Sequence, residues 1–397
     1  MIEKLLNPEV QSFIKAHLND DPVGLMLQLG KYPHLPMLEI ANQIKARQRL
    51  KKKLPEWISN ENIIFPHSLS QEQSSSQKTA EYKAQIFNGK SMADLTGGSG
   101  VDSWYFSKVF SRVDYIEPNK DLFDITSYNL AVLKATNINF YHEKAEDYLN
   151  RKIFVDLIYI DPDRRGNHNK KLVLLSDCEP DVTQLLQIVW DKTEAMLIKT
   201  SPMLDITASV RVLGTVESIH VVAIENEVKE VLYLLKKRPS VDIKVKTINF
   251  SHRGPAQKFD FYYNNEQLVK PSFSLPKNYL YQPNAAILKA GAFNIISQEF
   301  NCAKLQSNTH LYTSDKLLRG FPGRVFKIRE IMPFQKKALI KAIPEKKANI
   351  TARNFPVSVE AIRKKTGIKD GGNDYLFATT NLENKAIMIL CEKCIEA

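Results

Sequence analysis

Cysteine is scarce in this sequence: there are only four in 397 residues, and they are scattered. That is too few for the disulfide framework that holds small secreted domains together. Cys391 and Cys394 have the spacing of half a zinc knuckle, but a tetrahedral zinc site needs two more ligands and the sequence has no second such pair. We therefore expect two ordinary thiols and no bound metal.

Long apolar runs are also missing. No stretch approaches the roughly 18 uninterrupted apolar residues that cross a membrane. Residues 1–8 show no basic segment followed by an apolar run, so we expect no secretory signal and a cytoplasmic location. We find no internal repeat, and nothing points to a membrane or to a particular protein partner.

Positive charge, by contrast, is in excess. Fifty-five Lys and Arg face 44 Asp and Glu, a net charge of +11, and residues 326–370 alone hold twelve basic against four acidic residues. A clustered excess favours a polyanionic partner such as RNA. A second basic run lies at residues 45–53 (KARQRLKKK). Either cluster could instead be a solvated face that keeps the protein soluble.

The length favours two or three domains. Apolar residues at helical spacing predict helices over residues 1 to about 68, and the Ser- and Gln-rich stretch 68–78 has the composition of a linker. From about residue 90 short apolar runs alternate with helical segments, which predicts an α/β domain with a parallel sheet. The expected strands are residues 92–95, 113–117, 138–142, 154–160, 195–199, 219–224, 241–250 and 258–263.

Two helices are expected in the second half of the chain, over residues 227–238 and 284–300. Beyond them, alternating short strands and helices predict a small α+β module that carries the main basic cluster. We expect an N-terminal helical region at 1–85 and an α/β domain at 86–268. A small connecting segment at 269–322 and the basic module at 323–397 complete the expected division.

A glycine turn, residues 94–102 (DLTGGSGVD), directly follows the first strand. Parallel sheets bind ligands at the carboxyl ends of their strands, and glycine there lets the backbone approach the ligand. A dinucleotide site wants G-x-G-x-x-G, but Ser103 stands where the last glycine belongs, so a nicotinamide enzyme is disfavoured.

S-adenosylmethionine carries an ammonium, a carboxylate, a ribose and an adenine. Asp94 suits the ammonium, and the backbone N–H groups of the turn suit the carboxylate. Glu117, at the end of the next strand, is placed for the ribose hydroxyls, and Asp147, after the third strand, for the adenine amino group. Asp147 could equally be a helix cap. The remaining residues expected at the cofactor are Thr96, Gly97, Gly98, Gly100, Asp102 and Asp161.

The sequence resembles the class I methyltransferases over roughly residues 85–265. More narrowly, residues 94–102, 161–165 (DPDRR) and 198–205 (IKTSPMLD) resemble bacterial methyltransferases with a THUMP-like C-terminal domain. Residues 73–80 (QSSSQKTA) and 282–292 resemble that family too. The resemblance implies a Rossmann-like sheet, a ferredoxin-like segment at 269–322, a THUMP-like module at 323–397, S-adenosylmethionine as cofactor and methylation of RNA, either rRNA or tRNA.

Asp161, which closes the fourth strand, is where methyltransferases keep residues that face the methyl group. Enzymes acting on base amino groups usually have a second proline and an aromatic after Asp-Pro, whereas Asp163 and Arg164 stand here. Amino-group methylation is therefore in doubt. We expect Asp161 to orient the nucleophile or take its proton, with Arg164 and Lys199 beside it. Lys199 could instead be a solvated residue at a strand end.

The arginines 164 and 165 suit phosphate contacts or stacking, or else salt bridges to nearby aspartates. No cysteine lies on this edge, so a covalent pyrimidine mechanism is disfavoured. The Ser75–Thr79 stretch could fold over the cofactor rather than serve as a linker. An alternative to an enzyme is a non-catalytic RNA-binding protein on the same scaffold. The residues expected to contact RNA are Arg165, Lys346, Lys347, Arg363, Lys364 and Lys365.

Overall fold

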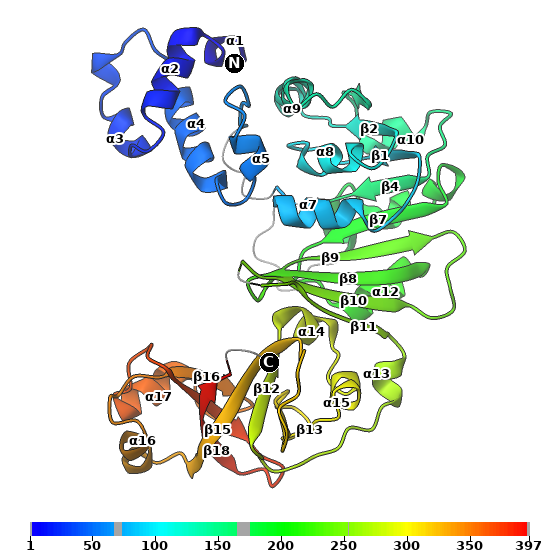
Figure 1. Cartoon of the computed structure of the whole chain (residues 1–397). Helices are drawn as coiled ribbons and strands as arrows, with labels where there is room; N and C mark the ends of the chain where they lie inside the picture. The colour runs from blue at the N-terminus through cyan, green and yellow to red at the C-terminus, as the bar shows by residue number, and fades with distance from the viewer. Residues whose placement is uncertain (1, 67–73, 165–174, 253, 395–397) are drawn as a thin grey trace. The chain divides into compact units, whose positions relative to one another are not determined.

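A computed structural model describes residues 2–66, 74–164, 175–252 and 254–394 (Figure 1). The chain divides into two compact units. One comprises Met1–Val216 with Tyr233–Pro239, and the other Glu217–Leu232 with Ser240–Ala397. No helix within the described ranges is long and apolar enough to span a bilayer.

Short helices form the N-terminal region, as the apolar spacing predicts. Asn7 and Asp21 cap α2 and α3 through their side chains, each just before a proline at the first helical position. The apolar faces pack into one core that includes Ile125 of α9 (Lys120–Val132), which ties this region to the α/β part of the first unit. The helices are α1 (Ile2–Leu5), α2 (Pro8–Ala16), α3 (Pro22–Met26), η1 (Leu29–Lys31), α4 (Met37–Leu50), α5 (Pro55–Ile58) and α7 (Gln77–Ala84).

The main sheet has nine described strands in the order β11-β10-β8-β9-β7-β4-β1-β2-β3. Strands β3, β2, β1, β4 and β7 pair in parallel, so their carboxyl ends share one edge. Strand β4 is buried at every position, as its apolar run predicts. The strands are β1 (Ser91–Asp94), β2 (Arg112–Ile116), β3 (Ile138–Tyr141), β4 (Leu157–Ile160), β7 (Ala195–Thr200), β8 (Val216–Ile224), β9 (Glu227–Lys236), β10 (Lys244–Phe250) and β11 (Gln257–Tyr262).

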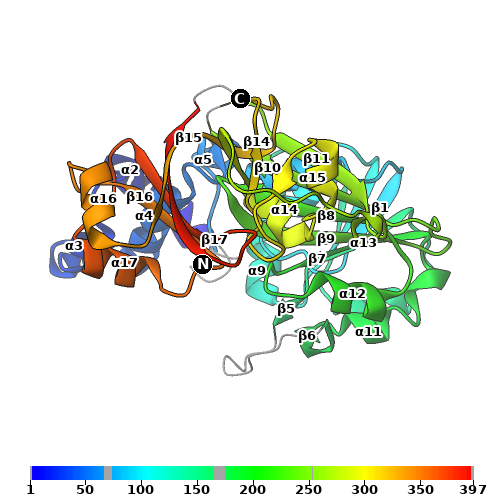
Figure 2. The same ribbon diagram turned by 90° about the horizontal axis from the view of Figure 1, so that it is seen from below.

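Helices connect the parallel strands, which confirms the α/β class. They are α8 (Val101–Ser107), α9 (Lys120–Val132), α10 (Ala145–Leu149), η2 (Leu175–Asp177), α11 (Val182–Leu185), η3 (Val189–Asp191) and α12 (Ile206–Leu213). A separate two-stranded sheet pairs β5 (Asp163–Arg164) with β6 (Cys178–Glu179), close to α11 in Figure 2.

The helix expected over residues 227–238 is wrong, because this segment is strand β9. Glu225 and Asn226 both have positive φ, so they form a tight turn that leads back from β8 into its neighbour β9. Residues 231–235 are consecutively buried. A continuous apolar run fits a strand covered on both faces as well as it fits a helix, and here the turn decided the outcome.

The second unit contains a seven-stranded sheet in the order β13-β14-β12-β15-β18-β17-β16. The single helix expected over 284–300 is also wrong: Gly291 ends the first helix in the left-handed conformation, and a second helix starts at Ile295. The elements are α13 (Asn265–Leu268), β12 (Tyr279–Pro283), α14 (Ala285–Ala290), α15 (Ile295–Glu299), β13 (Ala303–Lys304), β14 (Tyr312–Ser314), β15 (Gly323–Pro333), α16 (Lys336–Ala342), β16 (Asn349–Arg353), α17 (Val359–Thr366), β17 (Asp374–Thr380) and β18 (Ala386–Lys393).

Candidate functional site

The glycine turn joins β1 to α8 and is held tightly against β2 and α9. A Cβ on Gly97 would lie 2.2 Å from the Tyr115 ring, and one on Gly100, at φ +74°, would lie 2.4 Å from Thr126. The hydroxyls of Tyr115 and Thr126 both donate to the Gly98 carbonyl, at 2.7 and 2.9 Å. Glycine is therefore required at these positions for packing and for backbone conformation.

A cavity of about 870 Å³ opens over this turn. Its wall comes from the turn, the carboxyl ends of β1, β2 and β4, the start of α10 and the segment before α7. The lining residues are Ser74, Ser75, Asp94, Leu95, Thr96, Gly97, Gly98, Ser99, Val101, Asp102, Glu117, Pro118, Asn119, Leu122, Lys144, Ala145, Glu146, Asp161, Asp163, Glu179 and Pro180.

Asp94 lies at the end of β1 and is almost completely buried in this wall. Its carboxylate accepts hydrogen bonds from the Ser103 hydroxyl at 2.5 Å and the Thr96 N–H at 3.1 Å. Burial raises the pKa of Asp94 to about 7, and the nearby carboxylates of Asp102 and Asp161 add to the rise. A buried carboxyl with this pKa would ionise readily beside a cationic ligand.

Glu117 follows β2 and lines the same cavity. Its two oxygens accept the N–H groups of Gly98 at 2.9 Å and Asn119 at 2.7 Å. Burial raises the pKa of Glu117 even though these two bonds favour the ionised form. Because each carboxylate oxygen has two lone pairs, each can accept one further hydrogen bond, for example from a ribose hydroxyl.

Four of the turn amides, which were expected to suit a bound carboxylate, donate hydrogen bonds within the protein. The N–H of Thr96 donates to Asp94 and that of Gly98 to Glu117. The N–H of Gly97 donates to the Ile116 carbonyl and that of Gly100 to the Gly97 carbonyl. These four N–H groups therefore have acceptors within the protein.

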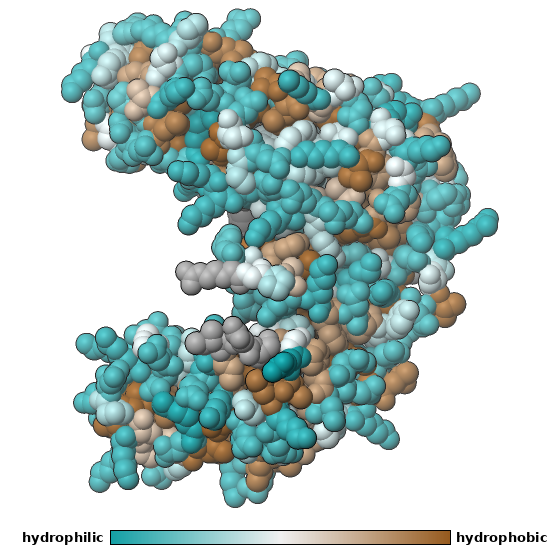
Figure 3. Space-filling model, in the orientation of Figure 1, coloured by the Kyte–Doolittle hydropathy of each residue, from teal (hydrophilic) through white to brown (hydrophobic). Residues whose placement is uncertain are grey.

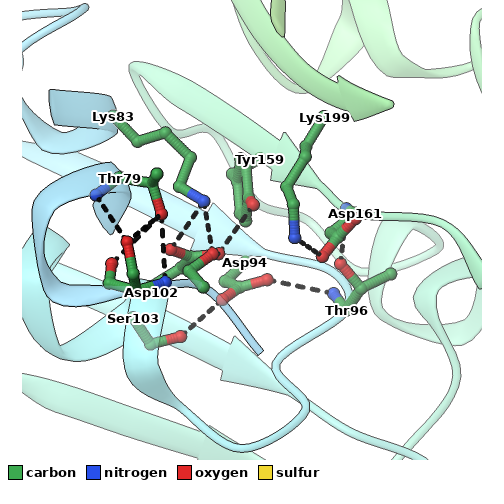
Figure 4. Close-up of polar contacts among 11 residues, drawn as sticks. Thr79, Lys83, Asp94, Thr96, Asp102, Ser103, Tyr159, Asp161 and Lys199 are labelled. Atoms are coloured by element: carbon green, nitrogen blue, oxygen red, sulfur yellow. Dashed lines mark hydrogen bonds and ion pairs between the residues drawn. The ribbon is translucent and has the colours of Figure 1, made fainter. Parts of the chain in front are cut away.

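Another part of the wall comes from a residue group that sequence reasoning only partly found. Ser75 is buried and donates to Asp102 at 2.9 Å, while Ser76 begins α7 with a capping box to Thr79. The ammonium of Lys83, on the same helix, lies 2.9 Å from Asp102 (Figure 4). It also donates a hydrogen bond to Ser75. The described part of the Ser-rich stretch thus forms cavity wall, whereas residues 67–73 lie outside the described residues.

Lys83 itself was missed. The visible signal was a serine-capped helix placed directly before the first strand, but a lysine on an amphipathic helix is ordinarily solvated. Asp102 was expected, and its pKa is lowered: burial alone would raise it, but the charges of Lys83 and Lys199 and a 2.8 Å hydrogen bond from the Tyr159 hydroxyl outweigh that effect.

The residues expected at the catalytic edge do meet. The N–H of Asp161 donates to the Thr96 hydroxyl at 2.7 Å, and the Asp161 carboxylate forms an ion pair with Lys199, the fifth residue of β7 (Figure 4). Burial, with the charge of Asp161, raises the pKa of Asp163. The backbone of Arg164 belongs to β5, but the Arg164 side chain and the whole of Arg165 lie outside the described part of the structure.

Two expected cofactor residues do not line the cavity. Asp147 is exposed on α10, and the wall there is formed by the three residues that precede it, Lys144, Ala145 and Glu146. Gly100 lies behind the wall as the left-handed residue that begins α8. Of the two adjacent acids on α10, Glu146 lines the cavity and Asp147 does not.

In the C-terminal module, Lys346, Lys347, Lys364 and Lys365 are exposed, as an RNA contact requires. Arg363 is different. Its guanidinium forms an ion pair with Asp370 and donates to the Ile368 carbonyl at 3.2 Å, so it holds the α17 end to the following loop. On the face drawn in Figure 3 hydrophilic residues predominate and apolar residues are scattered.

Comparisons with known proteins agree with this geometry. Residues 279–322 match a ferredoxin-like domain family and residues 323–393 the THUMP domain-like family. The crystal structure of a candidate methyltransferase from Porphyromonas gingivalis W83 is 32% identical, with a TM-score of 0.86, over 99% of this chain and 98% of that chain. The chain belongs to this family of class I S-adenosylmethionine-dependent methyltransferases with a THUMP-like C-terminal domain. The resemblance seen in the glycine turn is thereby confirmed.

Two further solved structures match this chain remotely. An rRNA methylase from Streptococcus thermophilus is 14% identical over 41% of this chain and 95% of that chain, with a TM-score of 0.29. TrmK from M. capricolum, in complex with S-adenosyl-homocysteine, is 11% identical over 45% of this chain and 71% of that chain, with a TM-score of 0.31. No curated protein matches significantly.

Proposed function

We propose that this protein transfers a methyl group from S-adenosylmethionine to RNA, and that the cavity over the glycine turn binds the cofactor. The observation that carries the proposal is the charge of that cavity. Among its described lining residues, Lys144 is the only Lys or Arg, and the acids are Asp94, Asp102, Glu117, Glu146, Asp161, Asp163 and Glu179. Such a wall suits a cationic ligand and disfavours the pyrophosphate of a dinucleotide.

The individual groups also fit the cofactor. Asp94 is buried and has a pKa of about 7, so an ammonium partner would favour its ionised form. Glu117 can accept hydrogen bonds from the ribose hydroxyls. When bound, S-adenosylmethionine supplies an activated methyl group on a positively charged sulfur. The chain has little covalent work to do: it holds the acceptor in line and excludes competing water. In this proposal Asp161 orients the acceptor, and its ion pair with Lys199 holds the carboxylate in position.

RNA as the substrate rests on the C-terminal module. It matches the THUMP domain-like family, which the sequence resemblance links to RNA methylation. It also presents exposed lysines that form no ion pair with a described acid, among them Lys346, Lys347, Lys364 and Lys365. Lysines of this kind bind backbone phosphates without reading sequence.

Two measurements test the proposal. Titration calorimetry should detect binding of S-adenosylmethionine and no binding of NADH, and Glu117→Gln should weaken the former. Incubation with methyl-labelled cofactor and total RNA, followed by separation by RNA size, should place label in one RNA class. Cofactor binding without any RNA labelling would contradict the substrate assignment, and binding of neither ligand would favour a non-catalytic scaffold protein.

A further inference from the structure

The strands β15, β18, β17 and β16 form one end of the seven-stranded sheet, and their two faces are covered differently (Figure 1). One face packs against α16 and α17 through residues such as Leu376 and Met388. The opposite face carries Phe326 and Phe377, which pack with leucines of the segment 305–311. This second face also bears positive charge.

Two arginines belong to the face that carries the phenylalanines. Arg324 stands two residues before Phe326 on β15. Arg353 stands two residues after Thr351 on β16, and Thr351 pairs with Phe377 of β17. Side chains two residues apart on a strand share a face. The Arg324 guanidinium accordingly lies over the Phe326 ring, 5.6 Å from its centre.

The charges of these two arginines are not balanced by a described acid. Within the described residues neither forms an ion pair with Asp or Glu, and Arg324 donates instead to the Gln282 side chain at 2.5 and 3.1 Å. Both arginines are partly buried, and burial lowers the pKa of each. The charge of Arg353 lowers the pKa of Arg324 further, so the two guanidinium groups lie close enough to repel each other.

A histidine beside Arg353 experiences the same positive field. Burial lowers the pKa of His310 to about 4, and the charges of Lys304 and Arg353 add to the fall. The His310 ring stacks on Phe293, and its Nδ1 is buried with no hydrogen-bond partner among the described residues. Glu266 offsets the charge of Lys304, whereas no described acid acts on Arg353. This environment disfavours further positive charge and favours an anion.

A tyrosine lies next to the arginines. The ring centroid of Tyr375, on β17, is 5.0 Å from that of Phe326, and its hydroxyl acts on the charge of Arg324. Tyr375 is partly exposed, whereas Phe326 is buried. The planar guanidinium group binds phosphate oxygens in pairs, and the bases of single-stranded RNA stack on aromatic side chains. Two arginines beside a tyrosine therefore match the phosphate and the base of one nucleotide.

We propose that Arg324, Arg353 and Tyr375, here called the arginine site, bind one nucleotide of single-stranded RNA, with its phosphate between the guanidinium groups and its base on the tyrosine ring. The choice of RNA as the ligand rests on the proposed function. Two like charges held partly out of water cost folding free energy in the free protein, and a bound phosphate offsets that cost. The exposed Lys346 and Lys364 are point charges that attract RNA without fixing one nucleotide.

The first experiment measures the binding of a labelled eight-nucleotide oligouridylate by fluorescence anisotropy, without cofactor. Arg353→Met should weaken binding about tenfold, as loss of a hydrogen bond to a charged group implies, and should lower the salt slope by about 0.7. Arg211→Met, at an exposed position in the other unit, removes the same charge and should change neither quantity. Wild-type affinity in the Arg353 variant, or an equal loss in the Arg211 variant, would overturn the proposal.

The second experiment separates the base from the phosphate. Tyr375→Leu should weaken binding of the oligouridylate by about tenfold, as loss of one stacked base implies, and Tyr375→Phe should retain the wild-type affinity because it keeps the ring. An abasic strand of the same length should bind the wild type and Tyr375→Leu equally well. An effect of Tyr375→Leu that persists with the abasic strand would contradict the stacked base and overturn the proposal.

The third measurement shows whether Arg353 serves the fold instead. In phosphate-free buffer Arg353→Met should melt at or above the wild-type temperature, because it removes the repulsion between the guanidinium groups. A fall of several degrees would mean that this guanidinium has a structural partner, and would overturn the proposal.

The ligand and the proposed function are tested separately. Inorganic phosphate that binds through Arg353 in calorimetry, with no effect of Arg353→Met on the oligouridylate, would assign the site to a small phosphate compound and overturn RNA as its ligand. Binding of the oligouridylate that depends on Arg353, with no methylation of any RNA, would support the arginine site and contradict the proposed function. Methylation of RNA with binding unaffected by Arg353→Met would do the reverse.

Discussion

The ammonium of Lys83 on α7 lies 2.9 Å from the carboxylate of Asp102 on α8, and the lysine side chain is entirely shielded from solvent. The same carboxylate accepts the hydroxyl hydrogen of Tyr159, on the buried strand β4, at 2.8 Å. Asp102 thus joins three elements around the glycine turn: α7, which precedes it, α8, which follows it, and β4, which lies beside it. Since a buried charge is stable only with its partner, this contact couples the fold of α7 to the shape of the cavity.

Removing one member of that pair should be costly. Lys83→Met leaves Asp102 ionised and largely buried without its main partner, and we expect a loss of about 3–5 kcal/mol in the free energy of unfolding, measured by urea denaturation. Combining it with Asp102→Asn should recover part of the loss. Lys15→Met breaks the exposed pair with Glu61 and should leave the stability close to that of the wild type, because exposed ion pairs contribute little. Equal effects of the two lysine substitutions would contradict this account of the buried pair.

Because of Asp94, the free energy of unfolding should fall as the pH rises. The folded state holds its proton up to a pKa of about 7, whereas the unfolded chain releases it near 3.8. Between these values the folded state binds more protons, so each rise in pH weakens wild-type stability until the effect levels off above 7. Asp94→Asn does not titrate. Its stability relative to wild type should therefore increase from pH 4 to pH 7 by on the order of 3–4 kcal/mol. Denaturation curves at pH 5 and pH 8 suffice, and a constant difference would refute the raised pKa.

The same group makes cofactor binding depend on pH in the opposite direction. An ammonium ligand requires the ionised carboxylate, so at pH 6 binding should release close to one proton and at pH 8 almost none. Calorimetry in two buffers of different ionisation enthalpy measures this release directly. The affinity should improve by up to about tenfold per pH unit below 7, as the linkage of one proton requires. Asp94→Asn should bind weakly and release no proton; unchanged release would mean that another group binds the ammonium.

Much of this site could be predicted because its signals are local in the sequence. A glycine turn directly after an apolar strand fixes where Asp94 lies, and the next strand end fixes Glu117. Parallel pairing then brings both to one edge. The strands β4 and β7 placed Asp161 and Lys199 by the same rule, and the structure pairs them. The family comparison supports the fold that this rule assumes.

The remaining features depend on contacts that the sequence does not show. An apolar run has no period that separates a strand from a helix, so the sequence predicts a helix where the structure has β9, and the turn at Glu225 decides the outcome. Glu146 and Asp147 are adjacent, and only the direction of α10 shows which faces the cavity. The role of Lys83 could be predicted only by knowing that its helix, α7, packs on α8.

Gly97 provides a test of the turn that is independent of charge. A Cβ there would lie 2.2 Å from the Tyr115 ring, which is buried and cannot move without disturbing the strand β2. Gly97→Ala should cost at least about 1–3 kcal/mol of stability, as overpacking does, and should also abolish cofactor binding. Gly30→Ala, where nothing lies within 4 Å of the added carbon, is the matched control. Wild-type melting temperature and affinity in the Gly97 variant would show that the turn is not packed as described.

Phosphate contacts by the C-terminal module should appear in the salt dependence of RNA binding. Each neutralised phosphate contributes about 0.7–0.9 to the slope of log affinity against log salt. Replacing Lys346, Lys347, Lys364 and Lys365 together by Gln should therefore reduce the slope by about 3. Arg363 stays in this variant because its guanidinium has partners within the module, an ion pair with Asp370 and a hydrogen bond to the Ile368 carbonyl. The measurement is fluorescence anisotropy of a labelled RNA across a salt series.

A variant with the same net charge separates local contacts from the general attraction of a basic protein. Lys4, Lys31, Lys152 and Lys270 are exposed and lie outside the module, so their replacement by Gln removes as much charge as the first variant does. If the module binds the backbone, only the first set lowers the slope, because screened charges more than a Debye length from the RNA contribute little. Equal slopes in the two variants would mean that net charge, and not this surface, attracts the RNA.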